Sequence, residues 1–268
     1  PHESSMINNI SVANVIDLCA SLEVNKFIFI STCSNYGMIE NNELADENFD
    51  LNPLSSYAKS KVDAEKRILS FYGNSKMNPT ILRFATAFGL SPRMRFDLTV
   101  SEFTREIALG NELLVYDSNT WRPYCHVQDF ARLIKIVIEA PTEDTSYEVF
   151  NAGGNENNAT KKMIVDYIIQ RIPNGKVKYQ NNGSDPRNYK VNFEKVRSTF
   201  GFEPKFNINF GTRYIQDPLI DLLINKKTIN IHMGIAPFYR GNASNFWASF
   251  DGNFNMIGST IHYLSKGL

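Results

Sequence analysis

The 268-residue sequence has few of the features that mark secreted, metal-binding or membrane proteins. Its three cysteines, Cys19, Cys33 and Cys125, are too few and too widely spaced for a disulfide framework or a zinc cluster. The longest wholly aliphatic or aromatic run, Phe27 to Ile30, is far shorter than a membrane span, and no signal peptide pattern precedes it. We therefore expect free thiols, no bound metal, no membrane partner and a cytoplasmic location for the intact protein.

An excess of charge of either sign is also absent. The 28 Lys and Arg residues balance the 28 Asp and Glu residues, so the chain lacks the positive field that binding to nucleic acid requires. With 43% hydrophobic residues, the chain is able to bury a sizeable core in one large domain, or in a domain and a smaller lobe. We expect a small molecule as the partner, and no nucleic acid.

Helical and extended patterns alternate along much of the chain. The expected helices are 5–22, 53–72, 128–139 and 160–171, and the expected strands are 25–31, 79–87, 124–127 and 147–151. Such alternation predicts the α/β class with a doubly wound parallel sheet, in which ligands bind beyond the carboxyl ends of the strands. Two segments, roughly 90–122 and 155–208, interrupt the alternation and indicate a second lobe.

The most informative feature of the sequence is the spacing between a tyrosine and a lysine. Tyr57 and Lys61 are four residues apart in a predicted helix, so both side chains project from one face of it. A neighbouring cation favours the phenolate, which makes the phenol a usable general base. Thr32, at the end of the preceding strand, is expected to hold the same substrate oxygen from the other side. A structural Tyr and Lys pair on an amphipathic helix is the ordinary alternative.

Four blocks carry a resemblance to a known family. They are 27–37 (FIFISTCSNYG), the YxxxK pattern at 57–61, 81–89 (ILRFATAFG) and 122–129 (RPYCHVQD). In this order they resemble the extended short-chain dehydrogenase/reductases, in particular the nucleotide-sugar epimerases and dehydratases, over roughly residues 1–225. The resemblance implies a Rossmann-type fold, the cofactor NAD, with NADP not excluded, and a nucleotide-diphosphate sugar as substrate.

The resemblance also divides the chain. It implies a partial dinucleotide-binding Rossmann core at 1–89 and 123–154 and a smaller α/β substrate-binding lobe at 90–122 and 155–227, with 228–268 left unassigned. The glycines form no GxxGxxG or GxGxxG between a strand and a helix, although the family starts with such a phosphate loop. We interpret the chain as a fragment without its first nucleotide-binding half, which is expected to bind dinucleotide poorly by itself.

Site residues follow from the resemblance position by position. The implied catalytic residues are Thr32, Tyr57 and Lys61. The implied cofactor-binding residues are Asn9, Ser31, Tyr57, Lys61 and Phe84, and the implied substrate-binding residues are Cys33, Ser34, Thr86, Arg95, Tyr116, Arg122 and Arg187. Arg93 is a further candidate for phosphate contacts, since a guanidinium donates two parallel hydrogen bonds to phosphate oxygens. For each arginine a surface salt bridge is the alternative.

The reaction implied by the resemblance is oxidation of a sugar hydroxyl, with Tyr57 as the base. The 4,6-dehydratases carry Asp and Glu after the threonine, whereas Cys33 and Ser34 stand here, so we expect 4-epimerization through a transient 4-keto sugar. A 4-keto-sugar reductase, a dehydratase of the same family, or a catalytically silent fragment or interaction module remain as alternatives. A homodimer through the helices that include 53–72 is also expected.

Overall fold

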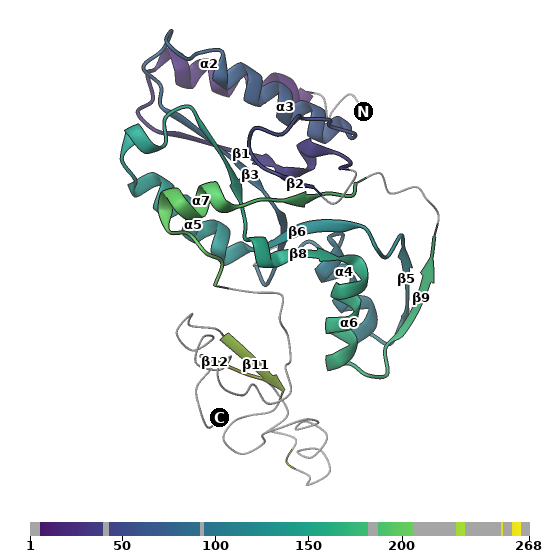
Figure 1. Cartoon of the computed structure of the whole chain (residues 1–268). Coiled ribbons are helices and arrows are strands. Elements are labelled where there is room, and N and C mark those ends of the chain that lie inside the picture. Colours follow the sequence, from purple (N-terminus) through teal and green to yellow (C-terminus); the bar gives the residue numbers. More distant parts are fainter. Residues whose placement is uncertain are drawn as a thin grey trace.

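The computed structural model describes residues 6–39, 43–91, 94–181, 187–205, 229–233, 253 and 259–263. At its centre lies a three-stranded parallel sheet in the order β1-β3-β7 (Figure 1). The strands span Phe27–Thr32 (β1), Pro79–Phe84 (β3) and Glu148–Ala152 (β7). Thr32 is paired with Phe84, and Phe84 with Ala152, so the carboxyl ends of all three strands lie together at one edge of the sheet.

Helices cover both faces of this sheet (Figure 1). One face carries a π-helical turn (η1, Met6–Ser11) that continues into α2 (Val12–Ser21), and α3 (Ser56–Leu69). The other face carries α5 (Val127–Glu139) and α7 (Glu194–Phe200). Strand side chains alternate accordingly, since Phe29 and Ile81 pack with α2 and α3 while Leu82 and Phe150 pack with α5 and α7. This arrangement confirms the predicted α/β class with a doubly wound parallel sheet.

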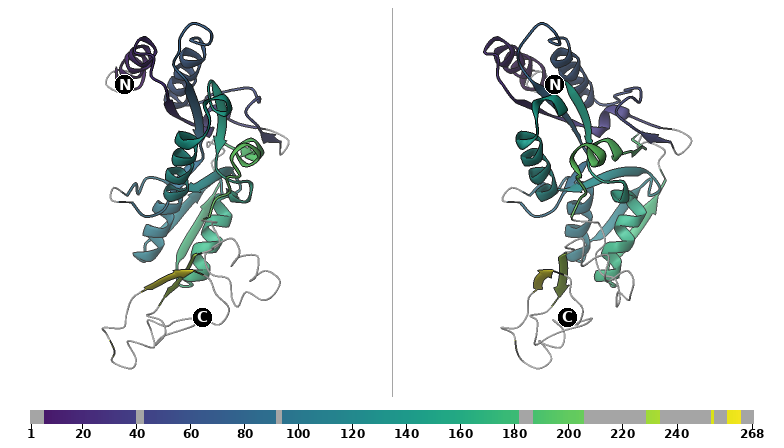
Figure 2. Two further views of the ribbon diagram at one scale, coloured as in Figure 1. Left: turned by 90° about the vertical axis from the view of Figure 1, so that its left-hand side faces the viewer. Right: turned by 60° about the vertical axis from the view of Figure 1, so that its left-hand side comes forward.

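A second cluster of elements forms a lobe with its own core. It consists of β4 (Thr86–Phe88), α4 (Thr99–Ala108), β5 (Glu112–Tyr116), β6 (Trp121–His126), β8 (Asn158–Thr160), α6 (Lys161–Arg171) and β9 (Lys176–Gln180). β6 lies between β4, which is parallel to it, and β8, which is antiparallel, whereas β5 and β9 form a separate parallel pair. In both views of Figure 2 the helices α2 and α3 lie at one end of the molecule, and the lobe lies beyond the central sheet.

The expected strand 79–87 is divided in the structure. β3 ends at Phe84 and stays in the central sheet, while β4 begins at Thr86 and pairs with β6. The break falls at Ala85, whose backbone N–H donates to the carbonyl of Ala152 at 3.0 Å. The chain therefore passes from the core to the lobe in a single residue, which an alternating apolar pattern does not reveal.

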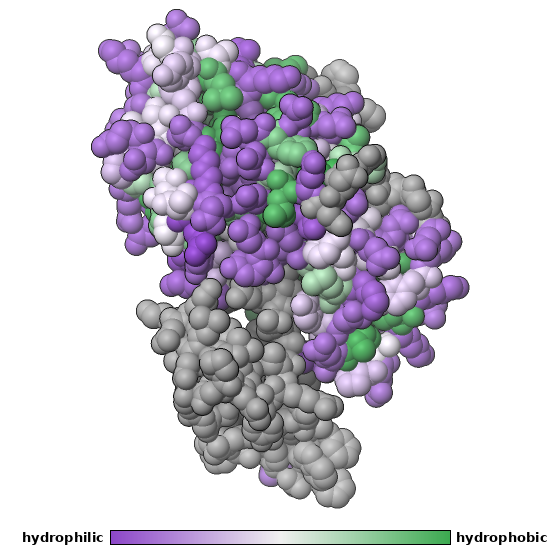
Figure 3. All heavy atoms as spheres, viewed as in Figure 1, coloured by the Kyte–Doolittle hydropathy of each residue, from purple (hydrophilic) through white to green (hydrophobic). Residues whose placement is uncertain are grey.

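Shorter elements complete the described chain. The strand β2 (Leu44–Ala45) pairs in parallel with β10 (Lys190–Val191), and the 3-10 turns are η2 (Cys33–Tyr36), η3 (Thr142–Asp144) and η4 (Asn155–Asn157). Within the tail that the sequence left unassigned, β11 (Ile229–Met233) and β12 (Ser259–Tyr263) form an antiparallel pair. Hydrophilic residues cover most of the face shown in Figure 3, with hydrophobic residues between them. In the described part of the chain, no helix has the length and apolarity needed to cross a membrane.

Candidate active site

The carboxyl end of β1 carries the first candidate residue. Thr32 is the last residue of the strand, and its Oγ1 accepts a hydrogen bond from the backbone N–H of Ser34 at 3.1 Å, which starts the turn η2. The turn is followed by Gly37 with a φ of +74°, where a Cβ would lie 2.0 Å from the carbonyl oxygen of Asn52. Only glycine fits this close approach. The loop that precedes α3 therefore packs directly against the turn that follows β1.

Helix α3 brings Tyr57 and Lys61 to the same place. Ser55 caps the helix, because its hydroxyl accepts from the backbone N–H of Ala58 at 3.1 Å, so the helix begins at Ser56 rather than at 53 as expected. Lys61 Nζ lies 5.7 Å from the centroid of the Tyr57 ring and donates to the carbonyl oxygen of Ile30 at 2.8 Å. The phenol is 49% exposed. Lys61 thus contacts the end of β1, and Tyr57 lies next to it on the same face of the helix.

The electrostatics differ from the expectation in one respect. Partial burial raises the pKa of Tyr57, and the cation that acts against this shift is Arg95 rather than Lys61. Burial also lowers the pKa of Lys61, with the carboxylate of Glu65 acting in the opposite direction. The reason is geometric, because the ammonium lies 4.7 Å from the centroid of the Phe29 ring and donates to the strand. In this arrangement the lysine donates its hydrogen bond to the sheet and not to the phenol.

The two residues after Thr32 have different surroundings. Cys33 is buried, its Sγ lies 3.1 Å from the carbonyl oxygen of Arg83, and burial raises the pKa of the thiol. Such a thiol stays protonated and packs as a small apolar side chain. Ser34 is half-buried and lies within hydrogen-bond distance of two other hydroxyls, Thr32 Oγ1 and the phenol of Tyr189, each at 3.2 Å. Tyr189 was not among the residues that the sequence indicated.

A buried polar network lies directly beneath Lys61. Glu65 is one helical turn further along α3, and its carboxylate pairs with the Arg83 guanidinium of β3 at 2.7 Å. The same carboxylate accepts from the Ser31 hydroxyl and from the Asn35 amide, the latter at 2.9 Å. Arg83 also donates to the Tyr36 hydroxyl at 3.0 Å, which in turn donates to Asn151 of β7 at 2.7 Å.

The network joins α3 to all three strands of the central sheet. Neither Glu65 nor Arg83 was among the site residues predicted from the sequence. The available signal was a charged residue inside the apolar run 79–84, since a buried arginine needs a partner.

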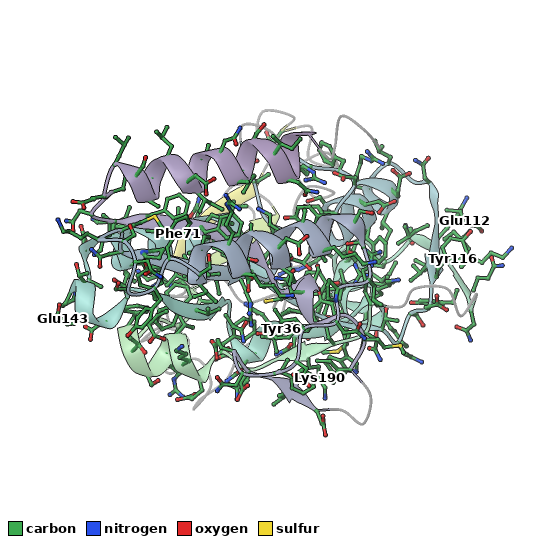
Figure 4. All side chains as sticks on the ribbon, turned by 90° about the horizontal axis from the view of Figure 1, so that it is seen from above. Tyr36, Phe71, Glu112, Tyr116, Glu143 and Lys190 are labelled. Atoms are coloured by element: carbon green, nitrogen blue, oxygen red, sulfur yellow. The ribbon has the colours of Figure 1, made fainter. Side chains whose placement is uncertain are left out.

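Other predicted residues lie in several parts of the fold. The Phe84 ring stacks on Phe130 of α5, with centroids 3.8 Å apart. Arg95 is exposed and donates to Asp97 Oδ1 at 2.9 Å. Tyr116 lies on the exposed side of β5, and Figure 4 shows it beside Glu112 at one end of the molecule, with Tyr36 near the middle.

The remaining predicted residues divide between buried and exposed positions. Arg122 is buried on β6 and Thr86 is half-buried on β4, whereas Asn9 and Arg187 are exposed. Arg93 lies outside the described residues. The cofactor-binding and substrate-binding roles of these residues stay predictions.

His126 has a structural role. His126 caps α5, because its Nδ1 accepts from the backbone N–H of Gln128 at 3.2 Å. Burial lowers the pKa of His126, which keeps the ring neutral and able to accept. Across the residues that the structure describes, no three His, Cys, Asp or Glu side chains are grouped in a way that would hold a metal ion.

Comparison with protein families gives one match that covers more than half of the chain. The NAD dependent epimerase/dehydratase family matches residues 1–153. Among curated proteins, the UDP-glucuronate 4-epimerase of Thermodesulfobacterium geofontis is 24% identical over 75% of this chain and 62% of its own length. The chain spans 60% to 65% of the length of the first three curated relatives that it matches.

Solved structures show the same fold. The dTDP-glucose 4,6-dehydratase of Bacillus anthracis in complex with NAD has a TM-score of 0.67 and 27% identity, covering 75% of this chain and 63% of that chain. The UDP-glucuronic acid 4-epimerase of Bacillus cereus, in complex with UDP-glucuronic acid and NAD, has a TM-score of 0.66, 22% identity and the same coverages.

Proposed function

Because the chain belongs to the NAD dependent epimerase/dehydratase family, we propose that the whole protein uses NAD to oxidise a hydroxyl of a nucleotide-diphosphate sugar. The finer proposal is 4-epimerization of a UDP-sugar through a transient 4-keto sugar. One observation supports it: the Lys61 ammonium donates to Ile30 near the carboxyl end of β1, which is Thr32, and lies 5.7 Å from the centroid of the Tyr57 ring. Parallel sheets bind their ligands at the edge formed by the carboxyl ends of their strands.

The residues at this edge of the sheet are able to hold one end of a bound dinucleotide. Lys61 is half-buried, and its Nζ donates to a strand carbonyl and lies near two aromatic rings, so a ribose hydroxyl is able to compete for its protons. Ser31, Phe84 and Asn9 are the further candidates for holding the cofactor. When bound, NAD supplies the acceptor of the sugar's hydrogen and later returns it.

The side chains of this chain supply proton transfer and orientation. Tyr57, as the phenolate, removes the proton of the C4 hydroxyl, and Thr32 holds that oxygen. Movement of Lys61 from Ile30 toward the phenol would bring the cation closer to the phenolate and lower the phenol's pKa. Arg95, Arg122 and Arg187 are the proposed contacts of the diphosphate, and Tyr116 that of the base.

Epimerization is favoured over dehydration by the residues after Thr32. Elimination of water needs an acid and a base near the sugar, and dehydratases of the family use a carboxylate pair. Here Cys33 is buried with a raised thiol pKa, and Ser34 is a neutral hydroxyl. Relatives named UDP-glucuronate 4-epimerase agree with this choice.

The homodimer is proposed to form through α2 and α3. These helices pack on each other, and α2 exposes Val15 and Leu18, while Leu22 is exposed at its C-cap. The three apolar residues follow helical spacing, which places them on one side. A partner helix pair covering this side would remove their apolar surface from water.

The test is Tyr57→Phe in the whole protein, with Tyr72→Phe as the matched control. Tyr72 is 72% exposed in the turn that follows α3, and its ring contact with Tyr147 does not need the hydroxyl. We expect Tyr57→Phe to lower the turnover of UDP-glucose or UDP-glucuronate about 10²- to 10⁴-fold while the far-ultraviolet spectrum stays the same. Near-normal turnover would remove the phenol from the mechanism. A wild-type protein with neither bound dinucleotide nor turnover would support the silent-module alternative.

A further inference from the structure

Three hydroxyl groups lie in series where β1 ends. Thr32 Oγ1 lies 3.2 Å from Ser34 Oγ, and Ser34 Oγ lies 3.2 Å from the Tyr189 hydroxyl. They come from the end of a strand, from the turn η2 and from the segment that leads into β10. The series therefore connects a proposed catalytic residue with a residue more than 150 positions later in the chain.

The far end of the series is held rigidly. Tyr189 is 3% exposed, and its backbone N–H donates to the carbonyl oxygen of Trp121 at 3.1 Å. The residue before it, Asn188, bonds the backbone of Ile39 at 2.9 Å and that of Trp121 at 2.8 Å. The phenol ring belongs to the buried core that also contains residues of the central sheet, α5 and α7. Its oxygen is thus a fixed point against which Ser34 is placed.

The number of protons and lone pairs on each hydroxyl indicates which group donates in each hydrogen bond of the series. A serine hydroxyl has one proton and two lone pairs. The Thr32 hydroxyl donates to Ser34 Oγ in this structure, and it would turn to the C4 oxygen of a bound sugar. The phenol is a stronger acid than an alcohol, so it is the better donor in its contact with Ser34. In either position of the Thr32 proton, the single proton of Ser34 is left to donate elsewhere, and a hydrogen bond accepted by a hydroxyl strengthens the one it donates. Ser34 is half-buried, so this proton has access to a ligand.

We propose that Tyr189 is a positioning residue that holds Ser34 as a hydrogen-bond donor to an oxygen of the substrate's sugar. The inference rests on the proposed function, and it adds a role for a residue that the sequence did not indicate. Tyr189 stays protonated for this purpose, because burial raises its pKa to about 12. Its role differs from that of Tyr57, which must lose its proton, since Tyr189 keeps its proton and donates it.

The experiment measures binding of UDP and of UDP-glucose to the whole protein by titration calorimetry. Loss of one hydrogen bond to the sugar is expected to weaken UDP-glucose binding about 5- to 10-fold in Tyr189→Phe, whereas UDP binding stays the same. The phenylalanine keeps the buried ring, and Ser34→Ala tests the same donor without altering the core. If Tyr189 acts through Ser34, the double variant is no weaker than Ser34→Ala alone.

The control is Tyr179→Phe, which removes a phenol hydroxyl from an exposed position on β9. In the turnover assay, Tyr189→Phe is expected to raise KM more than it lowers kcat, because the contact is made to the bound substrate. Equal weakening of UDP and UDP-glucose, or additive losses in the double variant, would overturn the inference and leave the proposed function standing. A wild-type protein that binds neither ligand would contradict both.

Discussion

Replacing Glu65 with Gln tests whether the buried network under Lys61 holds α3 on the sheet. The substitution keeps the size of the side chain and one carbonyl acceptor but removes the charge. Arg83, whose side chain is 6% exposed, then lies in the core without its counter-charge, and one of its partners becomes an amide donor that faces it. The Ser31 hydroxyl and the Asn35 amide keep an acceptor only if the new amide turns its oxygen toward them.

The expected magnitude follows from the burial of both partners. Removing one member of a buried ion pair costs about 3–5 kcal/mol, because the remaining charge stays desolvated. Since Gln retains one acceptor for Asn35 or Arg83, we expect the lower end, about 3 kcal/mol. With a urea m-value of about 3 kcal/mol/M, the unfolding midpoint falls by about 1 M. An exposed pair would give less than about 1 kcal/mol.

Urea unfolding followed by circular dichroism measures this difference, with Asp63→Asn as the matched control. Asp63 is an acid on the exposed side of the same helix, and its replacement is expected to change stability by less than about 0.5 kcal/mol. Equal midpoints for the two variants would refute the assigned role of the network. The same substitution removes the carboxylate that raises the pKa of Lys61, so the ammonium of the variant loses its proton at a lower pH than in the wild type.

Two further predictions concern the turn beside the site and the proposed dimer. Gly37→Ala should destabilise the protein by clearly more than Gly73→Ala, because both glycines have a φ of +74° but only at Gly37 would the new Cβ meet Asn52 O, at 2.0 Å. The control should cost about 1–2 kcal/mol from the left-handed backbone alone, and thermal unfolding showing equal losses would contradict the close packing. Leu18→Asp should convert a dimer to a monomer in sedimentation velocity, whereas Leu109→Asp, 68% exposed at the end of α4, should not. A dimer that survives the first change would place the interface elsewhere.

Much of the central core was predictable, because the patterns that indicate its helices and strands involve residues close together in the sequence. The apolar run 27–30 reads directly as a buried strand, and the Tyr57–Lys61 spacing fixes both side chains on one helical face whatever surrounds the helix. The prediction of one strand over 79–87 was less accurate, since the break at Ala85 depends on a hydrogen bond to Ala152, which lies 67 positions later. The strand β9 escaped prediction because its residues are mostly exposed and polar, and its partner β5 is distant in sequence.

In the candidate site, too, some residues were predicted from the sequence and others were found only in the structure. Thr32, Tyr57 and Lys61 were indicated by spacing and by resemblance, and their catalytic roles stay predictions. In the structure Thr32 ends β1, and Lys61 donates to Ile30 of that strand and lies 5.7 Å from the centroid of the Tyr57 ring. Glu65, Arg83 and Tyr189 were not indicated, because the importance of each lies in a partner from another segment.

The sequence by itself determined the alternating elements and the placement of a phenol and an ammonium on one turn of helix, because helical and strand periodicities depend only on near neighbours. Tertiary structure alone decided how those groups are charged and held. The pKa of a side chain depends on its burial and on the charges around it, and here these come from β1, α3 and the Arg95 segment together. The Lys61 ammonium points toward Ile30 rather than toward the phenol because of that packing. The spacing of Tyr57 and Lys61 in the sequence does not determine this direction.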